Sequence, residues 1–207
     1  MTKIILLAVL LFPSISLANE HDLLAMLKQK QSNSASLQKA IKAGSDRAML
    51  CKFCHGKDGN SVKPTIPNLA AQNTTYLIRQ FELFASKQRK NKTMNELARL
   101  LKPEEKVNVA LFFNAQKVRP QTIYRPQLVA AGKKLFELKC FFCHGKQAYG
   151  KETFPRIASQ PGEYIVKTLS SYSSNLVKRA ETDMSRVARA LNKDEIEKLA
   201  AYLTSLR

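Results

Sequence analysis

Apolar residues along the chain recur at helical spacing, and no convincing run alternates between apolar and polar positions as a strand does. Phe81 and Phe84 share one face of a predicted helix, and Leu169 and Tyr172 repeat that spacing in the second half of the chain. The pattern predicts an all-α fold, with helices over residues 45–50, 75–86, 133–139 and 162–173.

The last helix of each half carries a start signal. Pro103 suits a first helical turn, and Glu104 and Glu105 place negative charge near the positive end of the helix. Asn192 is a candidate N-cap with Glu195 at the third helical position.

The N-terminus has the pattern of an export signal. Lys3 supplies a positive start, and residues 4–12 form an apolar run that Pro13 ends. Such a run is too short to span a bilayer, which takes about 20 residues. We expect a signal peptide over residues 1–18, cleaved after Ala18, and therefore a periplasmic protein. The alternative is an uncleaved N-terminal anchor.

Two C-x-x-C-H motifs dominate the candidate chemistry, and they use all four cysteines of the chain. They read Cys51-Lys-Phe-Cys54-His55 and Cys140-Phe-Phe-Cys143-His144. This spacing is typical of c-type haem attachment, in which two thiols add to one porphyrin and the adjacent histidine binds the iron. We therefore expect two covalently bound haem c groups, with His55 and His144 as iron ligands.

Other readings of the motifs are weaker. Two zinc half-sites would not need a histidine after each cysteine pair. A thiol-redox motif needs a surrounding βαβ pattern, which the sequence lacks. No cysteine is left over for a structural disulfide.

The motifs belong to an internal duplication, because blocks of the first half recur in the same order 88–90 positions later. The linker between the two copies contains Pro120 and Pro126 and no helical period. The expected parts are the signal peptide 1–18, an N-terminal extension 19–42 that is helical or frayed, a first domain 43–117, the linker 118–127 and a second domain 128–207.

The second axial ligand of each iron is expected to be a methionine. Met94 follows His55 by 39 residues, and Met184 follows His144 by 40, each at the end of a polar, basic loop. His/Met ligation raises the potential and leaves no open position on the metal. The pattern therefore favours an electron carrier with no small-molecule substrate over an enzyme.

Three other candidate ligands have no such parallel. Met26 lies in the N-terminal extension, and Met49 is expected to pack in the core two residues before Cys51. His21 is expected to be a solvated residue near the new N-terminus.

The formal charge of +18 falls to +17 when Lys3 leaves with the signal peptide. Such a field attracts acidic docking faces of redox partners, or an anionic membrane surface at which the protein associates peripherally. Nucleic acid is not expected as a partner of an exported haem protein.

The order of blocks resembles the cytochrome c4 family, over nearly all of the chain after residue 43. The residues that carry the resemblance, beside the two haem motifs, are Pro67-Asn-Leu69-Ala-Ala-Gln72, Tyr76, Arg89 and Met94 in the first copy, and Pro155-Arg-Ile157-Ala-Ser-Gln160, Tyr164, Arg179 and Met184 in the second.

The resemblance implies two class I cytochrome c lobes related by a pseudo-twofold axis, each wrapped round one haem. It implies that the carbonyls of Pro67 and Pro155 accept a hydrogen bond from the axial histidines. Arg89 and Arg179 become candidate contacts of the haem propionates.

The resemblance further implies a carrier between a quinol-oxidising respiratory complex and a terminal oxidase or reductase. Two alternatives stay open. One is a dihaem enzyme, either a peroxidase or a dehydrogenase of a sulfur oxyanion. The other is a redox subunit of a larger membrane complex, held by residues 19–42. The chain departs from the family pattern in that extension, in its charge, and at residues 147–150, which replace the Asp-Gly-Asn-Ser of residues 58–61.

Overall fold

The computed structural model describes residues 20–173 and 182–207, and these are helical apart from loops and one isolated antiparallel bridge, between Lys151 and Phe154. The expected signal peptide and Arg179 lie outside the described residues. The elements are α1 (Glu20–Gln31), α2 (Ser34–Arg47), α3 (Met49–His55), α4 (Thr74–Ala85), α5 (Lys92–Leu100), α6 (Pro103–Asn114), the 3-10 turn η1 (Pro126–Leu128), α7 (Val129–Lys139), α8 (Phe141–His144), α9 (Gly162–Ser173), α10 (Asp183–Arg189) and α11 (Lys193–Ser205).

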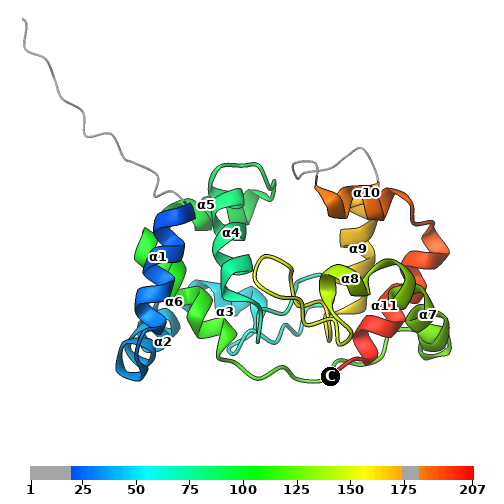
Figure 1. Ribbon diagram of the computed structural model, residues 1–207, viewed down its shortest axis with the longest axis horizontal. Helices are drawn as coiled ribbons and strands as arrows, with labels where there is room; N and C mark the ends of the chain where they lie inside the picture. The colour runs from blue at the N-terminus through cyan, green and yellow to red at the C-terminus, as the bar shows by residue number, and fades with distance from the viewer. Residues whose placement is uncertain (1–19, 174–181) are drawn as a thin grey trace, which may run out of the picture.

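The helices gather into two lobes (Figure 1). Lobe one contains α1 to α6 and lobe two contains α7 to α11, and the segment between α6 and η1 runs from one to the other along one side. Each lobe has its own buried apolar cluster. The loops that follow α3 and α8 meet between the lobes.

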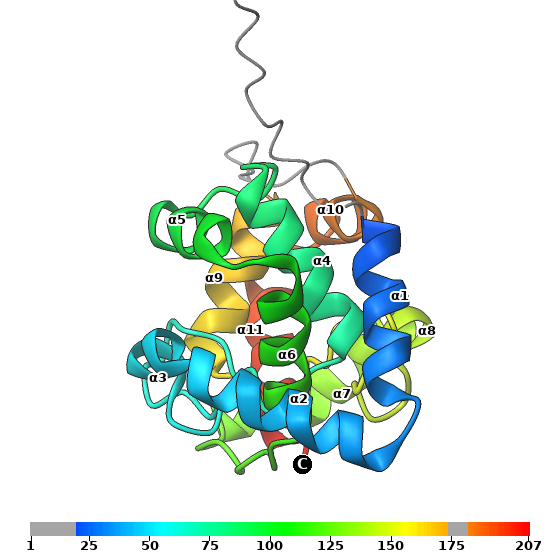
Figure 2. The ribbon, with the colours of Figure 1, turned by 90° about the vertical axis from the view of Figure 1, so that its left-hand side faces the viewer.

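Each lobe is built on one helix crossing, α2 against α6 in lobe one and α7 against α11 in lobe two. Figure 2 shows the first of these crossings. Glycine lies at both contacts, Gly44 on α2 and Gly132 on α7, so the two backbones approach closely. Helix α2 begins at Ser34, nine residues before the expected domain boundary, and the helix expected over residues 45–50 is divided between α2 and α3.

Helix α1 lies along lobe one beside α2, α4 and α6 (Figure 2). Leu23 and Leu27 are buried in the lobe core, and Lys30 pairs with Glu104 at the start of α6. The apolar face of α1 is thus covered by lobe one. None of the helices in the described residues is long and apolar enough to cross a membrane.

The expectation that Met49 packs in the core is wrong. Its side chain is 65% exposed, and its counterpart Leu138 is 82% exposed. Both residues precede their haem motif by two positions, and in both lobes this position faces outward. Sequence spacing alone did not show which way that turn of helix faces. His21 is exposed, as expected, and lies beside Asp22.

The loop in which lobe two departs from lobe one keeps the same backbone path. The carbonyl of Gly59, at φ +79°, accepts hydrogen bonds from the N–H groups of Leu69 and Ala70. The carbonyl of Ala148, at φ +56°, accepts the equivalent bonds from Ile157 and Ala158. Ala148 thus holds a left-handed conformation that glycine adopts more easily.

Candidate haem-binding sites

Each C-x-x-C-H motif ends a short helix on a buried histidine. His55 closes α3 and His144 closes α8, and both are only 7% exposed. The next residue is glycine in both lobes, at φ +82° for Gly56 and +74° for Gly145. This left-handed turn ends the helix and sends the chain back past the histidine.

The two histidines make equivalent hydrogen bonds. Nδ1 of His55 lies 2.9 Å from the carbonyl oxygen of Pro67, and Nδ1 of His144 lies 3.0 Å from that of Pro155. A carbonyl only accepts, so Nδ1 carries the proton and Nε2 presents its lone pair. Burial lowers the pKa of both histidines, although the carbonyl bonds act in the opposite direction. Both imidazoles are therefore held neutral, the form that binds a metal.

The first cysteine of each motif lies at the edge of a lobe core. Cys51 packs against the apolar cluster of lobe one and Cys140 against that of lobe two, and all four cysteines are free thiols. Burial raises the pKa of Cys140 to about 11 and shifts that of Cys51 in the same direction. The pairs are thus available for thioether bonds.

The two methionines occupy matching places. Met94 lies in the first turn of α5, where its N–H bonds the Asn91 side chain at 3.0 Å. Met184 lies in the first turn of α10, which begins with a capping box at Thr182. Each side chain is half-buried against the same apolar cluster as the cysteine of its lobe. In each lobe, the first cysteine of the motif and the expected methionine thus border the same apolar cluster.

Arg89 is half-buried at lobe one, and its guanidinium is held by side chains of α4. Its Nη1 donates to Oε1 of Gln80 at 2.6 Å, and its guanidinium stacks 4.5 Å over the ring of Phe84. Its charge is one of the influences that lower the pKa of His55. A held cation whose charge acts on His55 suits an anionic group of a bound cofactor.

Arg156 is a further candidate that the sequence analysis missed. It follows Pro155, is 8% exposed, and stacks 4.1 Å over the ring of Tyr149. Among the described residues no acceptor reaches its buried Nε. Burial lowers its pKa, and Tyr149 opposes the shift. A buried guanidinium with an unpaired N–H fits a carboxylate partner such as a haem propionate. Its counterpart in lobe one is Asn68, so the duplication does not repeat an arginine at this position and the sequence pattern does not mark Arg156 as a haem contact.

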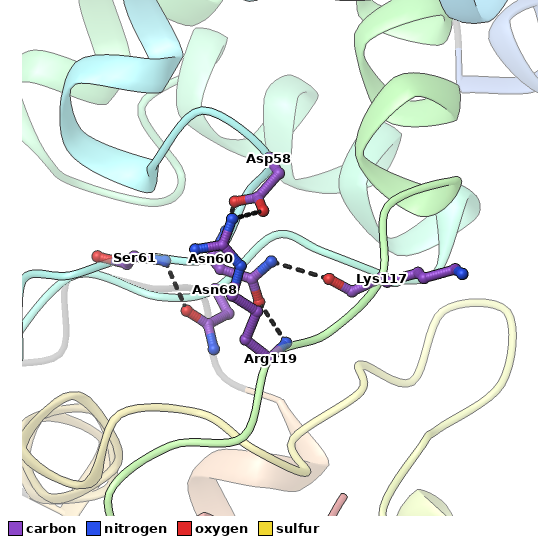
Figure 3. Close-up of polar contacts among 6 residues, drawn as sticks. All are labelled: Asp58, Asn60, Ser61, Asn68, Lys117 and Arg119. Atoms are coloured by element: carbon purple, nitrogen blue, oxygen red, sulfur yellow. Dashed lines mark hydrogen bonds and ion pairs between the residues drawn. The ribbon is translucent and has the colours of Figure 1, made fainter.

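A polar cluster ties the linker to the loop after His55 (Figure 3). The Asn60 side chain donates to the carbonyl of Lys117 and accepts from the N–H of Arg119, both at 2.8 Å. Asp58 pairs with the Arg119 guanidinium. The N–H of Ser61 donates to the Asn68 side chain at 2.8 Å, and Asn68 lies at the contact between the lobes.

Comparison with known proteins agrees with this geometry. The cytochrome c family model matches residues 129–207. Cytochrome c4 of Pseudomonas aeruginosa is 30% identical over 176 residues, which cover 79% of this chain and 87% of that protein. The chain belongs to the cytochrome c4 family.

Two further relatives show the extent of the likeness. The crystal structure of reduced cytochrome c4 from Pseudomonas stutzeri superposes with a TM-score of 0.73 at 28% identity, over 80% of this chain and 98% of that one. The thiosulfate dehydrogenase electron acceptor of Stutzerimonas stutzeri is 28% identical, over 88% of this chain and 91% of that protein.

Membership of the cytochrome c4 family confirms the expected all-α fold of two tandem class I lobes and the expected cofactors, two covalently bound haem c groups. The donor set fits them, since each lobe offers a thiol pair, a neutral histidine and a thioether. When bound, haem supplies a one-electron ferric–ferrous couple. The protein is a dihaem electron-transfer cytochrome.

Proposed function

We propose that this cytochrome is a periplasmic carrier that takes electrons from a quinol-oxidising respiratory complex and delivers them to a terminal oxidase or reductase. His55 and His144 bind the irons through Nε2, and Met94 and Met184 complete the coordination. The observation that carries the proposal is the matched pair of methionines, each placed with the cysteine of its motif at one lobe core. A metal closed on both faces exchanges electrons and binds no substrate.

Spectroscopy of the oxidised protein tests this coordination. We expect two low-spin haems and a long-wavelength sulfur-to-iron band equivalent to two methionine ligands. Replacing Met94 with His should remove half of that band and lower one of the two potentials, because imidazole stabilises ferric iron better than thioether does. The exposed Met49 is the matched control, and Met49→Leu should leave the band and both potentials unchanged. A full-strength band in Met94→His would refute the assignment.

Export is proposed from the first 18 residues, and Ala18 is the proposed cleavage site. The mature protein purified from its periplasm should begin at Asn19 and carry two haem adducts by mass spectrometry. An intact N-terminus on a membrane-bound protein would instead support the uncleaved anchor.

The partners are proposed to be redox proteins with acidic docking faces, because the mature chain carries a net charge of +17 before the haem propionates are counted. Electron-transfer rates with such a partner should fall steeply as salt rises. A rate independent of salt would contradict this choice. Peripheral binding to anionic vesicles, removed by salt, would show that the same charge serves membrane association.

A second candidate function is electron acceptance from a sulfur-oxyanion dehydrogenase. One similar protein is named a thiosulfate dehydrogenase electron acceptor, which assigns the carrier role to the cytochrome and the catalysis to its partner. Addition of thiosulfate alone should leave the oxidised protein unreduced under this proposal. Direct reduction by thiosulfate, with a change to high-spin iron, would favour the enzyme alternative.

A further inference from the structure

The two lobes hold each other through a reciprocal pair of glutamines. The Gln72 side chain donates from Nε2 to the carbonyl of Arg156 at 2.9 Å, and its Oε1 accepts from the N–H of Arg156 at 2.7 Å. Gln160 does the same to Asn68, at 3.0 Å and 2.9 Å. All four residues are buried. The offset of 88 that relates Gln72 to Gln160 also relates Asn68 to Arg156, so the contact obeys the symmetry of the duplication.

Each glutamine ends a hydrogen-bonded chain that begins at the axial histidine of the other lobe. The peptide group between Pro67 and Asn68 accepts from His55 through its carbonyl and donates to Gln160 through its N–H. Only this one peptide group separates the imidazole of lobe one from the side chain of lobe two.

The symmetry-related series of hydrogen bonds leads from His144 of lobe two to Gln72 of lobe one. The peptide group between Pro155 and Arg156 accepts from His144 and donates to Gln72. Both chains are short, buried and composed of bonds between 2.7 and 3.0 Å. Hydrogen bonds in series polarise one another, and a low local dielectric strengthens the effect. A carbonyl whose peptide N–H is engaged is a stronger acceptor for the histidine.

We propose that Gln160 and Gln72 are positioning residues for the axial histidine of the opposite lobe, so that each lobe sets the reduction potential of the haem in the other. The proposal rests on the histidine ligation given under Proposed function. Stronger donation from Nδ1 makes the imidazole a more electron-rich ligand and favours ferric iron. Loss of Gln160 should therefore raise the potential of the haem held by His55, and loss of Gln72 that of the haem held by His144.

The test substitutes a glutamine in one lobe and measures the reduction potential of the haem in the other. Gln160→Met and Gln72→Met keep the length of the side chain and remove its two hydrogen bonds to the other lobe. Gln72→Met also removes the bond that Oε1 accepts from the N–H of Asn73, at 3.0 Å within lobe one. Redox titration is followed by NMR, because the backbone amides of each lobe report the oxidation of their own haem. In Gln160→Met the ferrous-to-ferric ratio of the lobe-one haem should rise about threefold at fixed potential, about 30 mV at 59 mV per tenfold. The lobe-two haem should not change, and Gln72→Met should show the reverse.

Asn73 provides the control for simple loosening of the interface. Its side chain donates across the lobes to the carbonyls of Tyr149 and Phe154, at 3.1 Å and 2.7 Å, and not to either peptide group of the two chains. The backbone N–H of Asn73 bonds Oε1 of Gln72, and the alanine variant keeps that N–H. Asn73→Ala removes two bonds between the lobes, as each glutamine variant does, and should leave both potentials in place. Equal shifts of both haems in a glutamine variant, a shift confined to the substituted lobe, or no shift would each overturn the proposal.

The unsubstituted protein offers an independent measurement if a variant does not mature. After subtraction of the paramagnetic shift of the ferric haem, the amide protons of Asn68 and Arg156 should move downfield when the haem of their own lobe is oxidised, because the hydrogen bonds in series then strengthen. No residual shift of either proton across the titration would overturn the relay. Failure of the proposed function has a different signature, since the unsubstituted protein would then lack two low-spin, histidine-ligated haems.

Discussion

Gly44 on α2 lies so close to the backbone of Asn108 on α6 that a Cβ at Gly44 would stand 2.0 Å from the Asn108 carbonyl oxygen. Gly132 meets the carbonyl of Lys198 at the same 2.0 Å in lobe two. Because the obstacle is backbone, a side chain at either position must push two helices apart. Gly44→Ala should destabilise lobe one by about 3 kcal/mol, the upper range for an overpacked site.

Denaturant unfolding of the holo-protein measures this loss. Gln38→Ala, at an exposed position of the same helix, is the control and should change stability by less than about 0.5 kcal/mol. Gly132→Ala should reproduce the loss in lobe two. A Gly44→Ala protein as stable as the control would show that α2 and α6 can separate freely.

The Lys106–Glu82 ion pair is specific to lobe one. Its Nζ–Oε1 distance is 2.7 Å, and the side chains are 7% and 21% exposed. The duplication replaces these residues with Ile196, which is buried, and Ser170, which is exposed. Glu82→Ser alone should cost about 3 kcal/mol, because it leaves a buried ammonium unpaired.

The double variant, Glu82→Ser with Lys106→Ile, places in lobe one the residue pair found in lobe two. It should recover most of the lost free energy of unfolding. Thermal unfolding of the two proteins side by side measures the difference. If the double variant is no more stable than Glu82→Ser alone, the buried charge is not the source of the loss.

Arg156 should stabilise an anionic partner at the contact between the lobes. Arg156→Met keeps the stem of the side chain and removes a buried positive charge, which should favour ferric iron and lower at least one haem potential. Lys167→Met, at an exposed position of α9, removes the same charge and should have little effect on either potential. Equal potentials in the two variants would exclude a special role for Arg156.

Asp58 should make a small, acid-sensitive contribution to stability. Burial raises its pKa, but hydrogen bonds from Asn60 and the charge of Arg119 outweigh that effect and hold the pKa below its usual range. A depressed carboxyl pKa stabilises the fold above the unfolded value, about 3.9, and the gain is lost as pH falls through the folded value.

Asp58→Asn should therefore lower stability at pH 7 by less than about 1 kcal/mol, since the Arg119 side chain of the pair is 58% exposed and its charge is screened by solvent. The difference from the unsubstituted protein should close as the pH falls from about 3.9 through the lower folded pKa of Asp58, where both proteins become uncharged at this position. Thermal unfolding as a function of pH measures it. A difference that does not narrow as the pH is lowered from 7 towards complete protonation of Asp58 would assign the effect to packing and not to charge.

Local chemistry explains which features could be predicted from the chain alone. Helix α9 has the predicted bounds, residues 162–173, and α4 begins and ends within one residue of its prediction. Helical spacing and start signals are properties of short segments, and so are the C-x-x-C-H motifs that specify two haems. The matched positions of Met94 and Met184 follow from the duplication and need no coordinates.

Contacts between the lobes could not be predicted in this way. In the sequence, Gln72 and Gln160 are only equivalent positions of the duplication. In the structure Gln72 bonds the backbone of Arg156, 84 positions away, and Gln160 bonds that of Asn68, 92 positions away. The burial of Arg156 could not be predicted for the same reason, and the exposure of Met49 depended on which way one turn of helix faces within its own lobe. By itself the sequence determined the all-α pattern and the two covalent haem groups, because covalent attachment and helix periodicity act over a few residues. Only the tertiary structure decided which residues of one lobe form hydrogen bonds with the other lobe. Those contacts depend on how two separately packed lobes dock against each other.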